Sequence, residues 1–166
     1  MKVKTTRFGE LELDESRIIT FAEGILGFPK YRKYVLLDRD KGSPFRWLQS
    51  VENEGSAFVL IDPLYIMPEY RIEVSKEDIS DLNLSSLDKA VVVCIVNISE
   101  GCKSVTANLL GPIIVNPEKM LAKQLILFDS PYSIKQNLIT SIQNKNADLE
   151  KCSAKGREQG DQGLKF

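Results

Sequence analysis

Residues 45–61 read FRWLQSVENEGSAFVLI, and this stretch decides the fold class. In its first part, FRWLQS, alternate side chains fall on opposite faces of an extended chain, because the side-chain period of a strand is two residues. The residues NEG at 53–55 suit a tight turn, and AFVLI then forms a second apolar strand that Asp62 and Pro63 end. The stretch therefore predicts a β-hairpin in the middle of the chain.

Short strands separated by turn residues continue on both sides of this hairpin. The N-terminal residues 1–13 predict a second hairpin, and the other predicted strands cover 18–21, 34–37, 70–74, 90–96, 104–110, 113–115 and 123–128. Many short strands of this kind are typical of a barrel or a sandwich. We expect a mainly β protein, a small antiparallel β-barrel-like domain with one short helix and a C-terminal helix.

The short helix is predicted by SKED at residues 75–78. Ser75 can accept a hydrogen bond from a free N–H group of the first turn, as an N-cap residue does. The helix is expected to end near residues 82–84.

The sequence pattern changes from strand-like to helix-like near residue 132. Ser130 and Pro131 suit the N-cap and the first position of a helix, and the apolar residues that follow recur near helical spacing. These residues are Ile134, Leu138 and Ile142. We therefore predict a β domain over residues 1–132, an amphipathic helix over 133–150, and a disordered tail over 151–166, where apolar residues almost vanish.

Two apolar loops are the candidate functional segments. Residues 21–29, FAEGILGFP, combine large apolar side chains with two glycines and a proline, so neither a regular helix nor a regular strand explains them. A second apolar loop, YIM at 65–67, precedes Pro68. Such loops are either tucked under the fold or offered to a partner. The candidate partner contacts are Ile25, Leu26, Phe28, Tyr65 and Met67.

Catalytic chemistry is not indicated by the composition. The chain has no histidine, the commonest general base and transition-metal ligand. Its three cysteines, Cys94, Cys102 and Cys152, show no Cys-x-x-Cys spacing, which argues against a zinc site or a disulfide framework. No glycine-rich phosphate-binding motif is present. We expect no catalytic residue, no cofactor and no metal.

Charge and hydropathy further limit the kinds of partner that the chain is expected to bind. The net charge is −1, from 22 basic and 23 acidic residues, and no basic block of the kind that follows phosphates is present. No apolar run reaches the roughly 20 residues that a membrane helix needs, and the start MKVK leads into alternating sequence rather than a signal peptide. We therefore expect a cytoplasmic protein that binds neither nucleic acid nor membrane directly.

Five phrases in a fixed order resemble one protein family. They are FxxGIxGFP at 21–29, SPFxxLQS at 43–50, FxxxDP at 58–63, VTANLxxPI at 105–113 and SPY at 130–132. Each phrase alone is weak, but together they resemble the FliW family of bacterial flagellar assembly factors. The resemblance implies a small β-barrel-like fold without enzymatic activity, and it does not extend beyond Tyr132.

The resemblance also implies two protein partners and no small-molecule substrate. One is flagellin, and the other is CsrA, a dimeric translational repressor that binds messenger RNA. In the scheme implied by the family, FliW sequesters CsrA and so relieves repression of flagellin synthesis, and accumulating flagellin then captures FliW and frees CsrA.

Two alternatives stay open at the level of sequence. The first is a general secretion chaperone or scaffold that binds an export substrate but has no role in translation. The second is a hydrolase that uses Asp62, Glu69 or Asp129.

Overall fold

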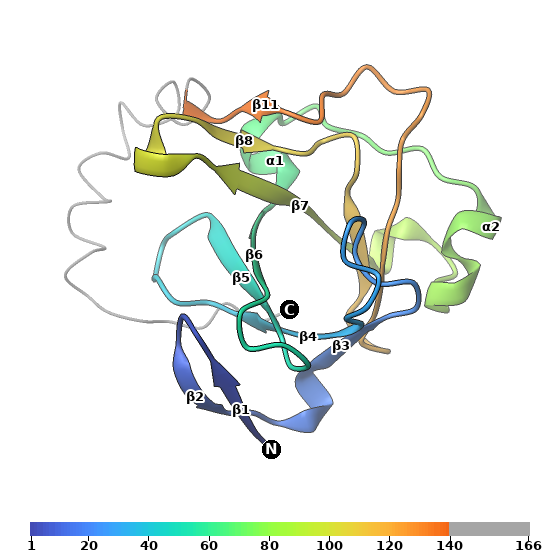
Figure 1. Cartoon of the computed structure of the whole chain (residues 1–166). Coiled ribbons are helices and arrows are strands. Elements are labelled where there is room, and N and C mark those ends of the chain that lie inside the picture. Colours follow the sequence, from blue (N-terminus) through green and yellow to red (C-terminus); the bar gives the residue numbers. More distant parts are fainter. Residues whose placement is uncertain (140–166) are drawn as a thin grey trace.

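Seven strands close into a barrel in a computed structural model of the chain, which describes residues 1–139 (Figure 1). The order around the barrel is β7-β6-β5-β4-β3-β10-β9 and back to β7. The bounds are β3 (Ile18–Phe21), β4 (Lys33–Leu37), β5 (Phe45–Ser50), β6 (Ala57–Ile61), β7 (Val91–Ile98), β9 (Ile113–Asn116) and β10 (Leu121–Gln124). Neighbours are antiparallel except β3 and β10, which are parallel with Thr20 opposite Leu121. The prediction of a mainly β, barrel-like fold is confirmed.

The central hairpin is formed by β5 and β6, with Leu48 opposite Phe58. Its turn is fixed from inside by Gln49, which is fully buried. The Gln49 side-chain amide donates to the carbonyl groups of Ser50 and Ser56 at 3.0 and 3.2 Å. The predicted turn is therefore held by a buried polar side chain as well as by its own sequence.

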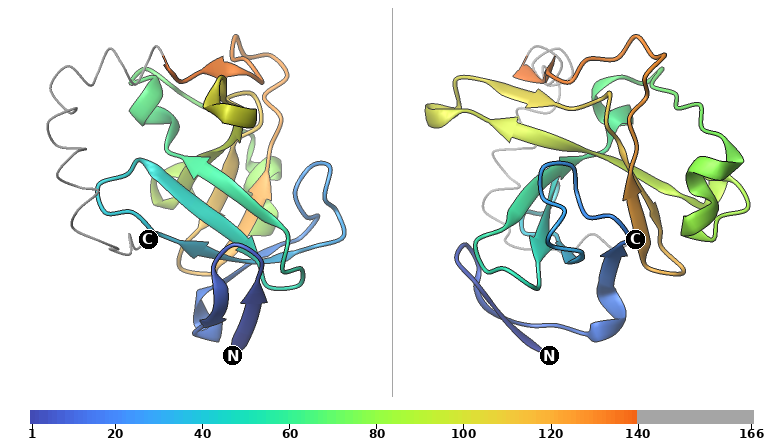
Figure 2. Two further views of the ribbon diagram at one scale, coloured as in Figure 1. Left: turned by 60° about the vertical axis from the view of Figure 1, so that its left-hand side comes forward. Right: turned by 45° about the vertical axis from the view of Figure 1, so that its right-hand side comes forward.

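The remaining strands lie outside the barrel. An N-terminal hairpin of β1 (Lys2–Thr5) and β2 (Gly9–Glu12) confirms the predicted hairpin and stands apart in the views of Figure 2. The long strand β7 pairs with β9 through its first residues and with β8 (Val105–Ala107) through its last. β11 (Gln136–Asn137) then extends the sheet beyond β8.

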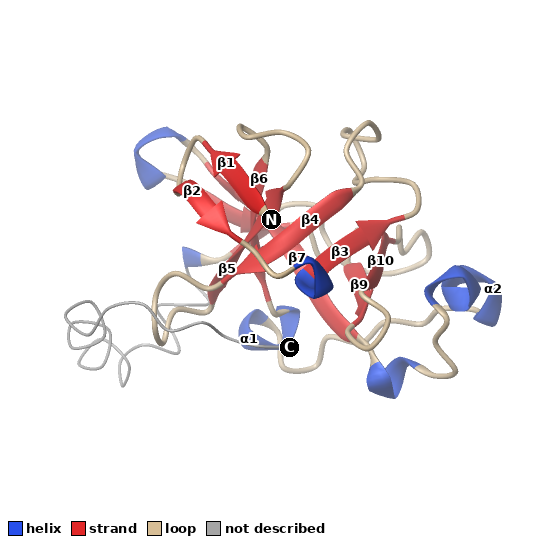
Figure 3. Cartoon of the chain, turned by 90° about the horizontal axis from the view of Figure 1, so that it is seen from below, coloured by secondary structure: helices blue, strands red, loops and turns tan. Residues whose placement is uncertain are grey.

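All helices of the described residues are single turns or 3-10 turns. The two α-helices, α1 (Pro63–Ile66) and α2 (Lys76–Ile79), lie outside the ring of strands in the view from below (Figure 3). The 3-10 turns are η1 (Glu15–Arg17), η2 (Ser80–Leu82), η3 (Leu87–Lys89) and η4 (Glu100–Cys102).

The predicted short helix is confirmed as α2 followed by η2. The backbone N–H of Asp78 donates to the Ser75 hydroxyl at 3.2 Å, and the Asp78 carboxylate accepts from the Ser75 N–H at 3.0 Å. This is a reciprocal capping box. Hydrogen bonding to Ser75 lowers the pKa of the Asp78 carboxyl.

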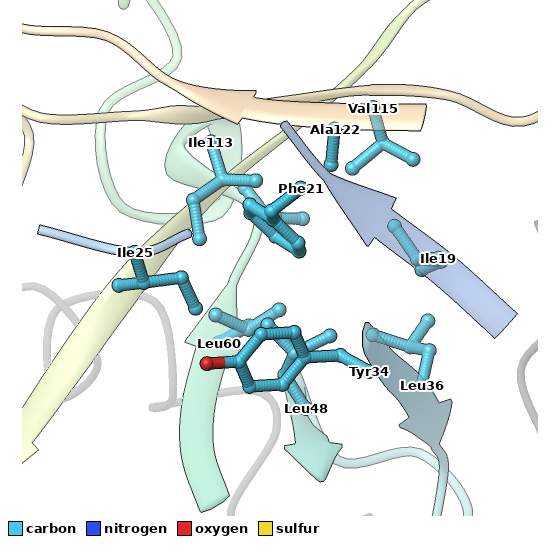
Figure 4. Close-up of a cluster of buried hydrophobic side chains, with 11 residues drawn as sticks. Ile19, Phe21, Ile25, Tyr34, Leu36, Leu48, Leu60, Ile113, Val115 and Ala122 are labelled. Atoms are coloured by element: carbon cyan, nitrogen blue, oxygen red, sulfur yellow. The ribbon is translucent and has the colours of Figure 1, made fainter. Parts of the chain in front are cut away.

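The barrel interior holds the main hydrophobic core, most of whose side chains are labelled in Figure 4. Its members are Ile19, Phe21, Ile25, Tyr34, Leu36, Leu48, Leu60, Val93, Ile113, Val115 and Ala122. The rings of Phe21 and Tyr34 meet edge to face at 5.2 Å. Burial is the main cause that raises the pKa of Tyr34 to about 12.

Two further clusters cover the outer face of the barrel wall. The larger one lies beneath α1, β8 and β11 and contains Ile61, Ile66, Tyr70, Cys94, Val96, Ala107, Leu109, Leu127 and Leu138. The smaller one lies beneath α2 and contains Ile79, Leu82, Ile114 and Leu125.

The predicted C-terminal helix is not confirmed. Over residues 133–138 the chain runs beside β8, where the Leu109 N–H donates to the Ser133 carbonyl at 3.0 Å and the Leu138 N–H to the Val105 carbonyl at 2.9 Å. The edge of β8 would otherwise leave its backbone groups unpaired, so sheet pairing overrides the helical spacing of the apolar residues. The rest of the predicted helix and the predicted tail 151–166 lie outside the described residues.

Three predicted strands also differ from the structure. The predicted strand 104–110 is β8 only over Val105–Ala107, and the chain bends at Leu109 and Leu110. Residues 70–74 belong to no sheet, although their burial alternates as predicted. The predicted strand 123–128 is β10 only as far as Gln124, and the chain then continues without a second neighbour.

Candidate protein-binding surface

Of the three predicted contact residues in the β3–β4 loop, one lies in the barrel interior and two lie on the surface. Ile25 is 1% exposed and points into the barrel (Figure 4), whereas Leu26 and Phe28 are 53% and 47% exposed. Ile25 is therefore a core residue and is removed from the candidate contacts. For Leu26 and Phe28, exposure agrees with the predicted role as partner contacts, which remains a prediction.

This separation depends on the backbone of two glycines. Gly24 and Gly27 have φ angles of 74° and 87°, in the left-handed region that favours glycine. The loop folds back so tightly that a Cβ atom on Gly24 would lie 2.8 Å from the Cα atom of Pro29. A hydrogen bond of 2.7 Å from the Phe28 N–H to the Ile25 carbonyl closes the turn.

The exposed end of the loop is tied to the barrel at two points. The Leu26 N–H donates to the side-chain oxygen of Gln124 at 3.0 Å, and the Gln124 amide donates to the Gly111 carbonyl at 2.9 Å. The Phe28 ring meets the Phe58 ring edge to face at 5.1 Å. The exposed apolar side chains are thus held by a rigid scaffold.

Tyr65 and Met67 do not join this surface. They lie in and just after α1, which follows the last residue of β6, whereas Phe28 packs on Phe58 near the first residue of the same strand. Both side chains are half-buried and pack on the larger outer cluster. The two predicted groups of contact residues are therefore at opposite ends of β6.

Two exposed apolar residues that were not predicted as contacts follow Gln124. Ile126 and Phe128 are 40% and 83% exposed, whereas Leu125 and Leu127, which alternate with them in the sequence, are each 8% exposed. Ile126 lies two residues after Gln124, the residue that holds Leu26, and Phe128 begins the turn in which the Ser130 N–H donates to the Leu127 carbonyl at 3.1 Å. We call Leu26, Phe28, Ile126 and Phe128 the exposed apolar surface.

A groove with a volume of about 540 Å³ lies beside Ile126 and Phe128. Residues 125–132 form one wall, and Arg71, Glu73, Val74 and Asp78 form the other. The walls are joined at Tyr132, whose hydroxyl accepts from the Arg71 N–H at 2.8 Å and donates to the Arg71 carbonyl at 3.0 Å. The Tyr70 and Tyr132 rings pack at 4.5 Å.

The charged groups of the groove are mostly acidic. Glu73, Asp78 and Asp129 line it together with a single basic side chain, Arg71. The groove therefore carries a local excess of negative charge, although the whole chain is nearly neutral.

The chemistry of the described residues does not favour catalysis. Cys94 is fully buried, and burial is the main cause that raises the pKa of its thiol to about 12, so little reactive thiolate forms near neutral pH. The Asp62 carboxylate accepts from the Leu64 N–H at 2.9 Å and so caps α1. Within residues 1–139, no three His, Cys, Asp or Glu side chains are grouped to hold a metal.

None of the helices within residues 1–139 is both long enough and apolar enough to cross a bilayer.

Comparison with known proteins gives one consistent result. Residues 2–138 match the FliW protein family, so the expectation that the resemblance ends at Tyr132 is wrong. The chain is 42% identical over 139 residues to the flagellar assembly factor FliW of Natranaerobius thermophilus, covering 83% of this chain and 92% of that protein. It is 36% identical over 160 residues to FliW of Bdellovibrio bacteriovorus, covering 96% of this chain and 91% of that protein. A crystal structure of the flagellar assembly factor FliW superposes with a TM-score of 0.76 at 33% identity, covering 83% of this chain and 96% of that one.

Proposed function

The chain belongs to the FliW family of flagellar assembly factors, and we propose that it binds the translational repressor CsrA and, in competition with it, flagellin. Binding of this chain would relieve CsrA repression of flagellin synthesis. Newly made flagellin would then capture the chain and free CsrA. The proposed role is not enzymatic, takes place in the cytoplasm, and needs no cofactor and no direct contact with nucleic acid or membrane.

The exposed apolar surface is the structural observation that carries this proposal. Phe128 is 83% exposed and Leu26 is 53% exposed, and the backbone of Leu26 is fixed to Gln124. Large apolar side chains presented on a rigid scaffold are suited to anchor a protein partner.

Charge supports action through a protein rather than through RNA. The net charge is −1, and the groove beside the exposed apolar surface is lined by three carboxylates. Proteins that bind RNA by themselves commonly present a basic surface to its phosphates. An effect of this chain on translation would therefore pass through a repressor.

A gel-shift titration with labelled flagellin leader RNA tests the proposal. We expect the purified chain to weaken the CsrA–RNA complex, to form no RNA complex alone, and to lose its effect when flagellin is added. Flagellin binding without any effect on CsrA would favour the general export chaperone. An RNA complex with the chain alone would contradict the proposal.

Adjacent residues of the β3–β4 loop supply a matched pair of variants. Leu26→Ala should weaken partner binding and leave the melting temperature nearly unchanged, because the side chain is exposed. Ile25→Ala should instead lower stability by about 2–5 kcal/mol, because it opens a cavity in the barrel core. Unchanged binding by folded Leu26→Ala would show that the partner contacts lie elsewhere.

A second pair separates the two predicted groups of contact residues. Phe28→Ala and Tyr65→Ala are compared for melting and for binding of CsrA and flagellin. We expect loss of binding from the first variant, and loss of stability from the second because Tyr65 packs on the larger outer cluster. Loss of binding by folded Tyr65→Ala would show that α1 belongs to the binding surface.

A further inference from the structure

We infer that the groove between residues 71–78 and 125–132 binds an extended peptide that adds a strand to the open edge of residues 125–127. The peptide has basic side chains that meet the groove carboxylates and apolar side chains that pack on Ile126 and Phe128. This inference rests on the proposed function to the extent that the peptide belongs to one of the protein partners.

The first wall of the groove is a strand edge with free backbone groups. The Leu125 and Leu127 N–H groups donate to the Pro112 and Leu110 carbonyls at 2.9 and 2.8 Å, which continues the pairing of β9 and β10 on one side. Neither the Ile126 N–H nor the Phe128 N–H donates a hydrogen bond within the described part of the chain, and Phe128 begins the turn that the Ser130 N–H closes on the Leu127 carbonyl at 3.1 Å. An unpaired edge of this kind is a template for another strand.

The edge is open because its neighbour ends. β3 pairs with β10 at Leu121 and Ala122 and ends at Phe21, opposite Ala122. The chain then turns away into the β3–β4 loop, which touches the strand once more where Leu26 binds Gln124. Beyond Gln124, the place of a neighbouring strand is not filled by residues 1–139.

The second wall has the sequence of a strand and no partner. Burial alternates along residues 70–74, with Tyr70 buried, Arg71 and Glu73 exposed, and the two residues Ile72 and Val74 half-buried. Among residues 1–139, none accepts a hydrogen bond from the N–H of Ile72, Glu73 or Val74. The capping box of α2 and the Tyr132 hydroxyl fix the two ends of this segment. Two walls with unpaired backbone therefore face one groove.

Side chains around the groove define the chemistry of the peptide. In strand addition, backbone hydrogen bonds give affinity and alternate side chains give specificity. Phe128 supplies an apolar contact at 83% exposure. Glu73, Asp78 and Asp129 outnumber Arg71 among the charged groups, so basic residues at the alternate positions of the peptide are complementary.

The test uses the full chain and a probe that is independent of CsrA and flagellin. A display library of random 12-residue peptides is selected on the folded protein and counter-selected on the Phe128→Ala variant. We expect enriched sequences that alternate apolar and basic residues. Recovery of no enriched sequence, or of sequences without basic residues, would contradict the inference.

Binding is then measured for synthetic copies of the enriched peptides, with matched controls. Phe128→Ala and Glu73→Lys should each weaken binding about tenfold or more. Ile98→Ala and Glu100→Lys change an exposed apolar and an exposed acidic residue outside the groove and should have no effect. Equal losses from both pairs would indicate a nonspecific interaction and overturn the inference.

Hydrogen–deuterium exchange of the complex distinguishes strand addition from side-chain contact alone. The amide of Ile126 should become protected when the peptide binds, whereas those of the β1–β2 hairpin should not. Binding without protection of the Ile126 amide would overturn the inference.

Failure of this inference can be told apart from failure of the proposed function. If CsrA and flagellin bind wild type, Phe128→Ala and Glu73→Lys equally, the groove is not their site and the proposed function still stands. If the enriched peptides bind with the expected protection but neither CsrA nor flagellin binds, the inference about the groove stands and the proposed partners are wrong.

Discussion

The barrel and the segment that follows β10 have similar strand-like sequences but different surroundings. Each of the seven barrel strands has a neighbour on both sides, with β7 and β9 closing the ring. Residues 125–127 keep a neighbour on one side only, and Phe128, which follows them, is 83% exposed. Alternation in a sequence thus reports which side chains are buried, and it leaves undecided whether both edges of the strand are paired.

The largest effect is expected inside the barrel. Phe21 is 1% exposed and packs edge to face on Tyr34. Phe21→Ala should lower the free energy of unfolding by about 3–5 kcal/mol, because the cavity is enclosed on all sides. Urea denaturation followed by circular dichroism measures this. A loss below about 1 kcal/mol would show that the barrel core is not the main source of stability.

The second-largest loss of stability is expected at alkaline pH, where the buried Cys94 of the barrel wall titrates. Burial raises the pKa of the Cys94 thiol from its ordinary value of 9.0 to about 12. The folded state therefore keeps a proton that the unfolded state loses above pH 9, so stability falls as the pH rises from 9 towards 12. We expect Cys94 to account for a loss of roughly 2 kcal/mol between pH 9 and 11.

The Cys94→Ala variant is the control for this pH dependence. It should remove the loss that begins at pH 9 and leave the later one from two buried tyrosines. Burial raises the pKa of Tyr34 from an ordinary value of 10.0 to about 12, and it also raises the pKa of Tyr70. Denaturant titrations at several pH values measure both. An unchanged slope between pH 9 and 10 in the variant would contradict the assignment to Cys94.

The loop at the border of the two regions should be sensitive at one glycine and tolerant at the other. A Cβ atom on Gly24 would meet the Pro29 backbone at 2.8 Å, whereas one on Gly27 has no heavy atom within 4 Å. Both residues have positive φ, which alone costs alanine about 1 kcal/mol. Gly24→Ala should therefore cost about 2 kcal/mol or more, and Gly27→Ala about 1 kcal/mol.

Thermal melting compares the two glycine variants directly. Equal losses would show that the close contact between Gly24 and Pro29 relaxes at no cost.

The capping box beside the groove should have a smaller effect. Ser75→Ala removes the acceptor of the Asp78 N–H and should lower stability by about 1 kcal/mol. The same variant should loosen the wall formed by residues 71–74, which hydrogen–deuterium exchange can detect. Stability equal to wild type would show that α2 is fixed by the packing of Ile79 in the smaller outer cluster rather than by its cap.

The smallest effect on stability is expected at Phe128. Because its side chain is 83% exposed, Phe128→Ala should change the free energy of unfolding by no more than about 0.5 kcal/mol. A loss approaching that of Phe21→Ala would make Phe128 a structural residue and remove the contrast between the two regions.

Much of the fold could be predicted from local signals. The hairpins, the strands β3 to β6 and the cap of α2 follow from alternation, from turn residues such as Asn53 and Gly55, and from the Ser75 hydroxyl. Interactions of this kind lie within a few residues of each other, so the sequence shows them directly.

Features that depend on distant partners could not be predicted. Leu138 has a helix-like spacing from Ile134, yet its N–H donates to the carbonyl of Val105, which no local pattern reveals. Likewise, Ile25 and Leu26 are neighbours with similar side chains, and only the fold decides that the first is buried and the second exposed.

Barrel closure has a consequence for how the chain acquires its structure. The parallel pair of β3 and β10 joins Thr20 to Leu121, roughly 100 residues later in the chain. Contacts of such large sequence separation fold slowly, because the intervening segment must be ordered first. During synthesis, β3 can therefore pair with β10 only after most of the chain has left the ribosome. The hydrogen bond from Leu26 to Gln124 also forms only at that late step, so the exposed apolar surface is completed late.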